Sequence, residues 1–165
     1  MSRYNTIIPN DVVNGRGVCV SLFVQGCPHH CKGCFNKETW DFDDGIPYTQ
    51  KTKFQILKLI NANGIERNFS VLGGEPLAPQ NLTMTMDIIH TVRKVYPKIK
   101  IFLWTGYTYE ELAKSNFCLN TILKDIDVLI DGPFIQEKKD LSLVLRGSSN
   151  QHIWAKKEGQ WIIKE

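Results

Sequence analysis

The sequence predicts an α/β fold built around parallel strands, with a short β-hairpin at the C-terminus. Three observations support this prediction. Apolar runs alternate with amphipathic stretches between residues 18 and 130, as is typical of parallel strands joined by helical crossovers. The run 18–24 is apolar almost throughout, as expected for a parallel strand that is covered on both faces. Residues 153–163 contain two short apolar segments around Lys157-Glu158-Gly159, which predicts the hairpin.

The apolar runs place the strands along the chain. A short opening strand is expected at residues 4–8, followed by a turn at Asn14-Gly15-Arg16-Gly17. The four strands of the alternating region are expected at residues 18–24, 69–72, 99–104 and 126–130.

Four helices are expected between these strands. The first, over residues 51–62, has apolar residues at intervals of three and ends at Asn63-Gly64; these residues are Phe54, Leu57 and Ile60. The second, over residues 79–96, has a buried stripe and stops before Pro97; the stripe is Ile88, Ile89, Val92 and Val95. Thr108 and Glu111 have capping-box spacing and begin the third, and a weaker fourth is expected over residues 120–124.

Length and composition limit the possible classes of protein. We expect one domain over residues 1–165, with 42% apolar residues and a net charge of +3 that gives no reason to expect a nucleic-acid partner. The N-terminus lacks the pattern of a signal peptide, and no apolar run approaches the roughly 18 residues of a membrane span. We therefore expect a cytoplasmic protein without a membrane partner, whose thiols stay reduced.

Three of the five cysteines lie close together after the strand at 18–24. Cys27, Cys31 and Cys34 have the spacing C-x3-C-x2-C, and such a cluster on a strand-exit loop indicates a metal site. A structural zinc ion needs four ligands, so His29 or His30 would have to complete the set. Cys19 and Cys118 are not obvious fourth ligands.

An iron–sulfur cluster is the other candidate for this loop. A [4Fe-4S] cluster also normally takes four thiolates. With three, one iron stays open and can bind a substrate. The spacing favours the cluster, and zinc remains the alternative.

The other strand ends carry residues suited to binding a ligand. They are Gly73-Gly74-Glu75-Pro76, Thr105-Gly106 and Asp131-Gly132. Ligands of parallel α/β proteins bind at the carboxyl ends of the strands, so we expect these turns and the cysteine loop to meet at one mouth.

The two strongest motifs resemble those of the radical S-adenosylmethionine (SAM) superfamily. The C-x3-C-x2-C spacing is that superfamily's signature, and Gly73-Gly74-Glu75-Pro76 is similar to its GGE-P motif, which binds the amino group of SAM. The chemistry agrees, because glycines admit close backbone approach and a carboxylate suits an ammonium group.

Longer stretches narrow the resemblance to one family. They are residues 26–40, Trp104-Thr-Gly-Tyr107 and Arg146-Gly-Ser-Ser-Asn-Gln151. Over about residues 4–154 the chain resembles the activating proteins of anaerobic (class III) ribonucleoside-triphosphate reductases. This resemblance implies an incomplete barrel of parallel strands, open on one side.

The resemblance also implies a mechanism and partners. Cys27, Cys31 and Cys34 would hold three irons, and the fourth iron would chelate SAM. An external donor such as a flavodoxin would reduce the cluster, and SAM would split into methionine and a 5′-deoxyadenosyl radical. That radical would take a hydrogen from a glycine of the large reductase subunit, with no general acid or base required. The family is described as dimeric. The alternatives are an activase of another glycyl-radical enzyme, of the formate-lyase type, and a non-catalytic zinc-binding module.

Individual residues receive expected roles from the same resemblance. Gly33, Cys34 and Phe35 would lie along the SAM adenine, although Phe35 could instead pack in the core. The methionine part of SAM would be bound by Gly73, Gly74 and Glu75. Thr105 and Asp131 would either reach the carboxylate or ribose of SAM or serve as caps and turn residues. The role of the Arg146–Gln151 stretch does not follow from the sequence.

Overall fold

The computed structural model describes all 165 residues except for the side chains of residues 118 and 119, so the side chain of Cys118 lies outside the described residues. The fold is mixed α/β, with one eight-stranded sheet in the order β3-β1-β2-β4-β5-β6-β7-β8. The strands are β1 (Arg3–Asp11), β2 (Cys19–Val24), β3 (Ile46–Pro47), β4 (Asn68–Gly73), β5 (Ile101–Trp104), β6 (Val128–Asp131), β7 (His152–Lys157) and β8 (Gln160–Ile163). The helices are α1 (Gln50–Ile60), α2 (Pro79–Val95), α3 (Tyr109–Ala113) and α4 (Asn116–Thr121).

Parallel pairing is confined to the centre of the sheet. Strands β2, β4, β5 and β6 are parallel to one another, as the alternating pattern predicts. The other four of the seven pairings are antiparallel, so parallel strands form only the centre of a sheet that is mostly antiparallel, and the sheet as a whole is not the parallel barrel that the sequence predicts. At the β1 side the reason is the short connection over residues 12–18, because a parallel pair needs a crossover of about a dozen residues or more.

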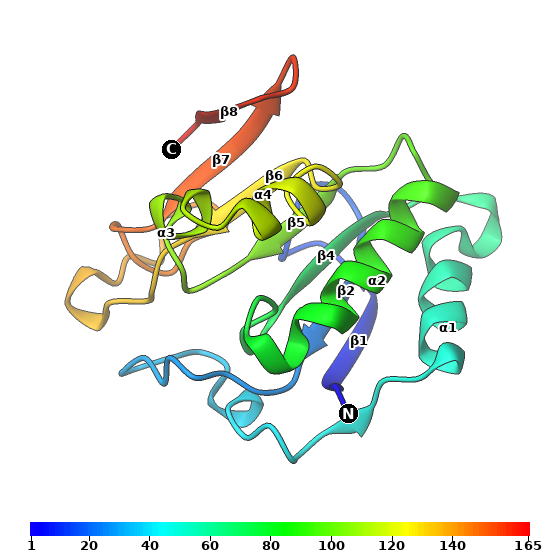
Figure 1. Ribbon diagram of the computed structural model, residues 1–165, viewed down its shortest axis with the longest axis horizontal. Coiled ribbons are helices and arrows are strands. Elements are labelled where there is room, and N and C mark those ends of the chain that lie inside the picture. Colours follow the sequence, from blue (N-terminus) through cyan, green and yellow to red (C-terminus); the bar gives the residue numbers. More distant parts are fainter.

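The core lies between the central strands and the helices that cover them. Figure 1 shows α1 and α2 side by side next to the β1–β2–β4 part of the sheet, with the β7–β8 hairpin at the far edge. The parallel strands supply fully buried residues such as Leu22, Val71 and Leu103, and α2 supplies Ile88 and Val92. The sheet and helices together hold the strand ends in fixed positions.

Helices α1 and α2 form where the sequence predicts them, but the residues on their buried faces were predicted less accurately. In α1 the buried residues are Thr52, Ile56 and Ile60, and Phe54 is 61% exposed because it lies about 200° around the helix from Thr52. In α2 the stripe of Ile88, Ile89 and Val92 is buried as predicted, but it ends there, and Val95 is 49% exposed.

The C-terminal part of the chain follows the sequence pattern with one shift. The capping box of Thr108 and Glu111 begins α3 as predicted. Helix α4 ends at Thr121, so the helix expected at residues 120–124 begins too late. The β7–β8 hairpin is confirmed, and its turn residues Glu158 and Gly159 both have positive φ, as a two-residue hairpin turn requires.

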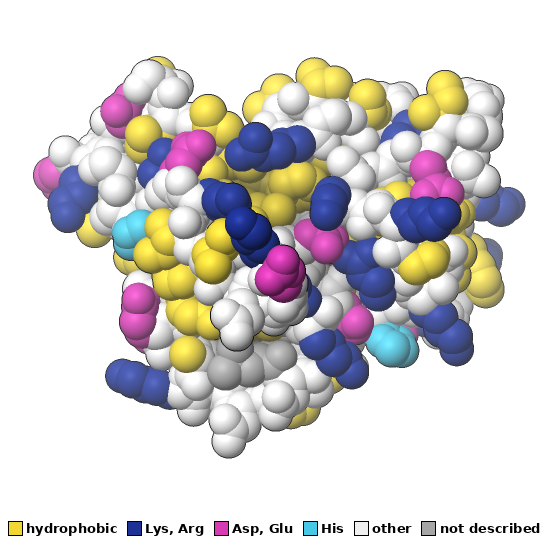
Figure 2. Space-filling view, turned by 90° about the horizontal axis from the view of Figure 1, so that it is seen from above, with side chains coloured by type: hydrophobic (Ala, Val, Ile, Leu, Met, Phe, Trp, Pro, Cys, Tyr) yellow, Lys and Arg dark blue, Asp and Glu magenta, His cyan; other side chains and the backbone are white. Residues whose placement is uncertain are grey.

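The surface gives two further observations. Among the described residues, no helix is both long enough and apolar enough to cross a bilayer. On the face seen in Figure 2, basic and acidic side chains are interspersed with apolar ones.

Candidate functional site

The carboxyl ends of the four parallel strands meet around one small cavity, as the sequence predicts. This cysteine cavity has a volume of about 130 Å³. It is lined by Cys27, His29, Cys31, Cys34, Asn36, Trp40, Leu72, Gly73, Gly74, Glu75, Trp104, Thr105, Gly106, Gly132, Phe134 and Gln151. The cysteine motif and the Gly-Gly-Glu-Pro turn, which lie at the ends of successive parallel strands, therefore share one cavity.

The cysteine loop is fixed at its base by backbone hydrogen bonds. The Gly26 N–H donates to the Thr39 carbonyl at 2.7 Å, and the Cys27 N–H donates to the Trp40 carbonyl at 3.1 Å. Burial raises the pKa of the Cys27 thiol to about 11 and also raises the pKa of the Cys31 thiol. Burial therefore favours the protonated form of both thiols, and a metal would have to displace their protons.

All three cysteines line the cysteine cavity. Within the described part of the chain, no three His, Cys, Asp or Glu side chains are arranged to hold a single metal ion. Cys34 Sγ accepts a hydrogen bond from the Asn36 N–H at 3.3 Å, which orients that thiol.

Both glycines of the Gly-Gly-Glu-Pro turn are required by close backbone packing. Gly73 has φ +102°, and a Cβ there would lie 2.8 Å from the Phe23 Cα. A Cβ on Gly74 would overlap the Gly26 carbonyl oxygen. The turn is instead held against the cysteine loop by hydrogen bonds, with the Glu75 N–H 2.9 Å from that same carbonyl oxygen.

The Glu75 carboxylate is buried and accepts four hydrogen bonds. Oε1 accepts from the Leu77 N–H at 2.9 Å and from the Thr105 hydroxyl at 2.8 Å. Oε2 accepts from the Gly106 N–H at 2.7 Å and lies 2.8 Å from His29 Nε2. The hydrogen bond to Glu75 raises the pKa of the His29 imidazole. His29 thus joins the cysteine loop to the acidic residue of the second motif.

The side-chain amide of Asn81 provides a second link between the two loops. This residue lies in the first turn of α2 and is 1% exposed. Its Nδ2 lies 3.0 Å from the Gln25 carbonyl oxygen, 3.2 Å from that of Gly26 and 3.0 Å from that of Glu75. One amide group therefore fixes the position of the cysteine loop relative to the Gly-Gly-Glu-Pro turn.

Of the candidate residues Gly33, Thr105 and Asp131, only Thr105 lines this cavity. Thr105 lines it, but its hydroxyl is directed to Glu75. The Asp131 carboxylate is 1% exposed, accepts from the backbone N–H groups of Tyr109 and His152, and is not among the lining residues. Gly33 also lies outside the lining and has φ +77°, where a Cβ would come within 2.9 Å of the Gln136 side chain.

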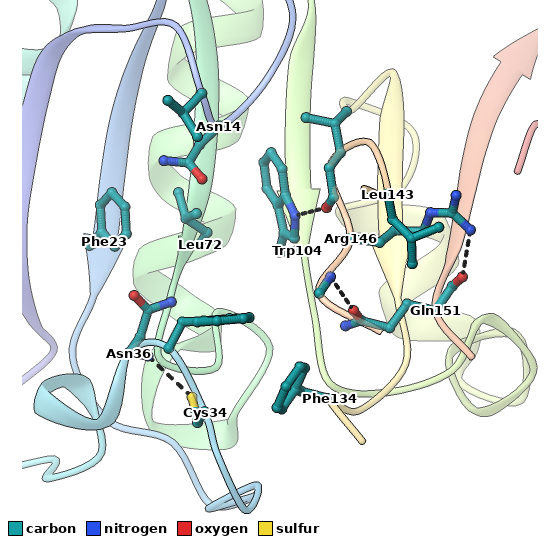
Figure 3. A pocket seen from close by; sticks show the side chains of 14 residues that line it. Asn14, Phe23, Cys34, Asn36, Leu72, Trp104, Phe134, Leu143, Arg146 and Gln151 are labelled. Atoms are coloured by element: carbon teal, nitrogen blue, oxygen red, sulfur yellow. Dashed lines mark hydrogen bonds between the residues drawn. The ribbon is translucent and has the colours of Figure 1, made fainter. Parts of the chain in front are cut away.

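A larger outer cavity of about 440 Å³ adjoins the cysteine cavity. Figure 3 shows Phe23 and Leu72 on one side of it and Trp104, Leu143 and Gln151 on the other. Phe35 also lines it and is 54% exposed, so the alternative of a core phenylalanine is wrong. The Phe35 ring centroid lies 5.1 Å from that of Phe134 and 5.3 Å from Lys139 Nζ.

Comparisons with known proteins identify the family. Residues 13–154 match the model of a 4Fe-4S single cluster domain. The anaerobic ribonucleoside-triphosphate reductase-activating protein of Pasteurella multocida is 44% identical over 153 residues, which cover 92% of this chain and 96% of the relative. The protein of that name from Escherichia coli K12 is 42% identical over 150 residues, or 90% and 96% of the two chains. The one from phage T4 is 35% identical over 159 residues, or 96% and 97%.

The chain belongs to the family of anaerobic ribonucleoside-triphosphate reductase-activating proteins. The family resemblance seen in the sequence is therefore confirmed, and the chain contains a 4Fe-4S domain.

The structure gives the family stretch Arg146–Gln151 a physical role that the sequence left open. Gln151 Oε1 accepts from the N–H groups of Gly147 and Ser148, and its Nε2 donates to the Gly132 carbonyl at 2.9 Å. Asn150 Nδ2 donates to the Pro133 carbonyl at 2.8 Å. The stretch thus supports the segment that leaves β6 at the wall of the cysteine cavity.

Sequence reasoning missed three parts of this site. They are the hydrogen bond between His29 and Glu75, the hydrogen bonds donated by the Asn81 side-chain amide, and the position of Gln151 in the wall of the cysteine cavity. Each joins residues that are far apart in the chain. The only local signal was the presence of polar residues on otherwise apolar faces, such as Asn81 on the buried side of α2.

Proposed function

We propose that this protein activates an anaerobic ribonucleoside-triphosphate reductase by generating a glycyl radical on its large subunit, using SAM and a [4Fe-4S] cluster. One observation carries the proposal. In a chain 35–44% identical to named activating proteins, three cysteines and a Gly-Gly-Glu-Pro turn line the same cavity. A purely structural metal site has no need of the second motif.

The donor set fits a cluster with one open iron. Cys27, Cys31 and Cys34 would each bind a different iron, and all three line the same cavity. A single zinc ion would need four ligands around one point, and His29, one of the two candidate fourth ligands, is hydrogen-bonded to Glu75. These observations support the cluster over the zinc-binding module.

The residues around the cluster would position SAM. When bound, the cluster supplies the electron that cleaves SAM reductively, so that the adenosyl fragment can take a hydrogen atom from a glycine of the reductase. Gly73, Gly74 and Glu75 would hold the methionine part, with the buried carboxylate facing its ammonium group. All four acceptor sites of Glu75 are filled in this structure, so the ammonium would share Oε2 with His29 or replace it.

The other candidate residues would act on SAM directly or through a neighbour. Gly33, Cys34 and Phe35 would lie along the adenine, and the half-exposed Phe35 ring at the outer cavity supports this. Thr105 would act by holding Glu75. Asp131 would act by holding the backbone of Tyr109, the first residue of α3, and of His152, the first residue of β7.

The wider organisation remains part of the same proposal. We take β2, β4, β5 and β6 as the strands of an incomplete radical SAM barrel, and residues 1–165 as one domain. The site at their carboxyl ends supports this. The partners would be the large reductase subunit, a donor such as a flavodoxin and a second copy of the chain. Reduced thiols and an oxygen-sensitive cluster fit the cytoplasm.

A glycyl-radical assay separates the candidate partners. The reconstituted protein would be mixed under anaerobic conditions with SAM, a strong reductant and either the reductase or a formate-lyase-type enzyme. We expect a glycyl radical by electron paramagnetic resonance with the reductase. A radical only with the lyase would support the alternative activase and contradict the proposal.

A further inference from the structure

Exposed apolar side chains lie on three chain segments that supply lining residues of the outer cavity. We call these side chains the apolar rim. Its members lie on the β1–β2 connection, the cysteine loop and the segment between β6 and β7; they are Val12, Val13, Phe35, Leu141 and Val144, with exposed fractions of 71%, 74%, 54%, 80% and 50%. Val13 and Phe35 also line the outer cavity, so they mark its mouth. A gathering of exposed apolar residues at a cavity mouth is typical of an interaction site.

Asp11 orders the part of the apolar rim on the β1–β2 connection. Its Oδ1 accepts hydrogen bonds from the N–H groups of Val13, at 2.9 Å, and Asn14, at 3.2 Å. Its Oδ2 accepts from the side chain of Asn14 at 2.8 Å. Val12 and Val13 are therefore presented to solvent by a turn that is already ordered.

A strained leucine, Leu145, directly follows Val144 of the apolar rim. Leu145 has φ +59°, a conformation that a branched side chain rarely adopts. Its carbonyl accepts a hydrogen bond from Trp104 Nε1 at 2.9 Å. The N–H groups of Gly147 and Ser148, which follow shortly after, both donate to Gln151 Oε1. Strain of this kind persists only where the surroundings fix it, and it is found at ligand clamps and active sites.

The apolar rim lies on the route to the cysteine cavity. The outer cavity and the cysteine cavity share Cys34, Asn36, Leu72, Trp104, Phe134 and Gln151. A glycine that enters the outer cavity and gives up a hydrogen atom to a radical formed in the adjoining cysteine cavity must stay attached to its own protein. The chain on both sides of that glycine must therefore lie across the mouth of the outer cavity, beside the segments that carry the apolar rim.

We propose that the apolar rim is the docking surface for the large subunit of the reductase, which places its glycine in the outer cavity on an extended segment flanked by apolar residues. This inference rests on the proposed function, which makes the substrate a protein. Aliphatic and aromatic side chains at the centre of an interface supply most of its binding energy. The ordered turn and strained leucine reduce the entropy lost on binding.

Charged substitutions in the apolar rim test this proposal. We would prepare Val12→Asp, Leu141→Asp and the double variant, because neither side chain lines a cavity. Phe54→Asp is the matched control, since Phe54 is 61% exposed on the outer face of α1. The measurements are anaerobic binding to the reductase, glycyl-radical yield and SAM cleavage without the reductase.

The proposal predicts a selective loss. The double variant should bind the reductase at least about tenfold more weakly and lose radical yield in proportion, while SAM cleavage without the reductase stays at the wild-type rate. Phe54→Asp should behave as wild type throughout. If Val12→Asp does not fold, Leu141→Asp alone decides, because its side chain is 80% exposed on a loop.

Three results would overturn the inference. Wild-type binding and radical yield in the double variant would show that the apolar rim is not the docking surface, and would leave the proposed function standing. A change in the oligomeric state with unchanged reductase binding would make the apolar rim a contact between copies of this chain. Absence of SAM cleavage in the wild-type holoprotein would remove the proposed function first, and the inference with it.

Discussion

Replacing Asn81 by alanine would separate the two loops of the site. The Asn81 side-chain amide donates hydrogen bonds to two backbone carbonyls of the cysteine loop and to one of the Gly-Gly-Glu-Pro turn. After the substitution the Gly26 carbonyl keeps the Glu75 N–H, and the Glu75 carbonyl keeps the Ala78 N–H. Among the described residues, no second donor reaches the Gln25 carbonyl. The variant therefore leaves one buried carbonyl without a partner and removes the link between the loops.

The expected size of the effect follows from that single carbonyl. An unsatisfied buried acceptor costs about 1–3 kcal/mol. Taking about 2 kcal/mol, Tm should fall by about 4–8 °C for a chain of this length. If the same free energy is lost from SAM binding, Kd rises by at most about thirtyfold.

The assay compares Asn81→Ala with Thr85→Val, one turn further along α2. The Thr85 hydroxyl donates to the Pro76 carbonyl at 2.7 Å, so its loss weakens the turn without reaching the cysteine loop. Both variants should melt earlier, but only Asn81→Ala should bind SAM markedly more weakly and alter the SAM-induced change in the spectrum of the reduced cluster. Equal SAM affinity in wild type and Asn81→Ala would show that the Asn81 hydrogen bonds do not position the proposed SAM-binding turn.

Three further predictions concern the cysteine loop, the glycine turn and the rim turn. Cys31→Ala should lose the cluster with an open iron and all SAM cleavage, and cleavage retained in that variant would remove Cys31 from the ligand set. Gly74→Ala should lower Tm and iron content, because its Cβ overlaps the Gly26 carbonyl oxygen; a wild-type iron content would contradict this. Burial opposes ionisation of Asp11, but hydrogen bonds from Asn14 and the Val13 N–H outweigh it and lower its pKa below 3.8. The stabilising contribution of ionised Asp11 is thus present above about pH 4 and lost as pH falls through the lowered pKa. The difference in Tm between wild type and Asp11→Asn should therefore shrink in acid. A difference in Tm that stays constant with pH would contradict this role of Asp11.

The sequence predicted those parts of the site that depend on neighbouring residues. Cys27, Cys31 and Cys34 lie within eight residues after a buried strand, and the Gly73-Gly74 pair ends the next one. Because parallel strands place their carboxyl ends on one edge, these local motifs were enough to predict a shared cavity. The family could be recognised for the same reason.

The parts that the sequence did not predict depend on contacts between distant residues. His29 meets Glu75 across 46 residues, and Asn81 reaches Gln25 across 56. The pattern of polar and apolar residues shows that Asn81 is unusual on a buried face, but not which carbonyls it meets. Likewise, the exposure of Phe35 depends on where Phe134 and Gly147 lie, which follows from the long segment after β6.

The sheet edges illustrate the same limit. The alternating pattern identifies the four parallel strands, whereas the direction of β1 depends on the length of the connection to β2 and that of β7 on how residues 132–151 fold back. That segment is fixed by Gln151 and Asn150, whose hydrogen bonds have no counterpart in a periodic pattern.

In the proposed mechanism, Cys27, Cys31 and Cys34 hold a [4Fe-4S] cluster whose open iron binds SAM. Electron paramagnetic resonance of the anaerobically reduced protein, recorded with and without SAM, is the decisive measurement. We expect about four irons per chain and a reduced-cluster signal that changes when SAM is added. A colourless protein with one zinc ion, or a cluster signal that SAM leaves unchanged, would contradict it.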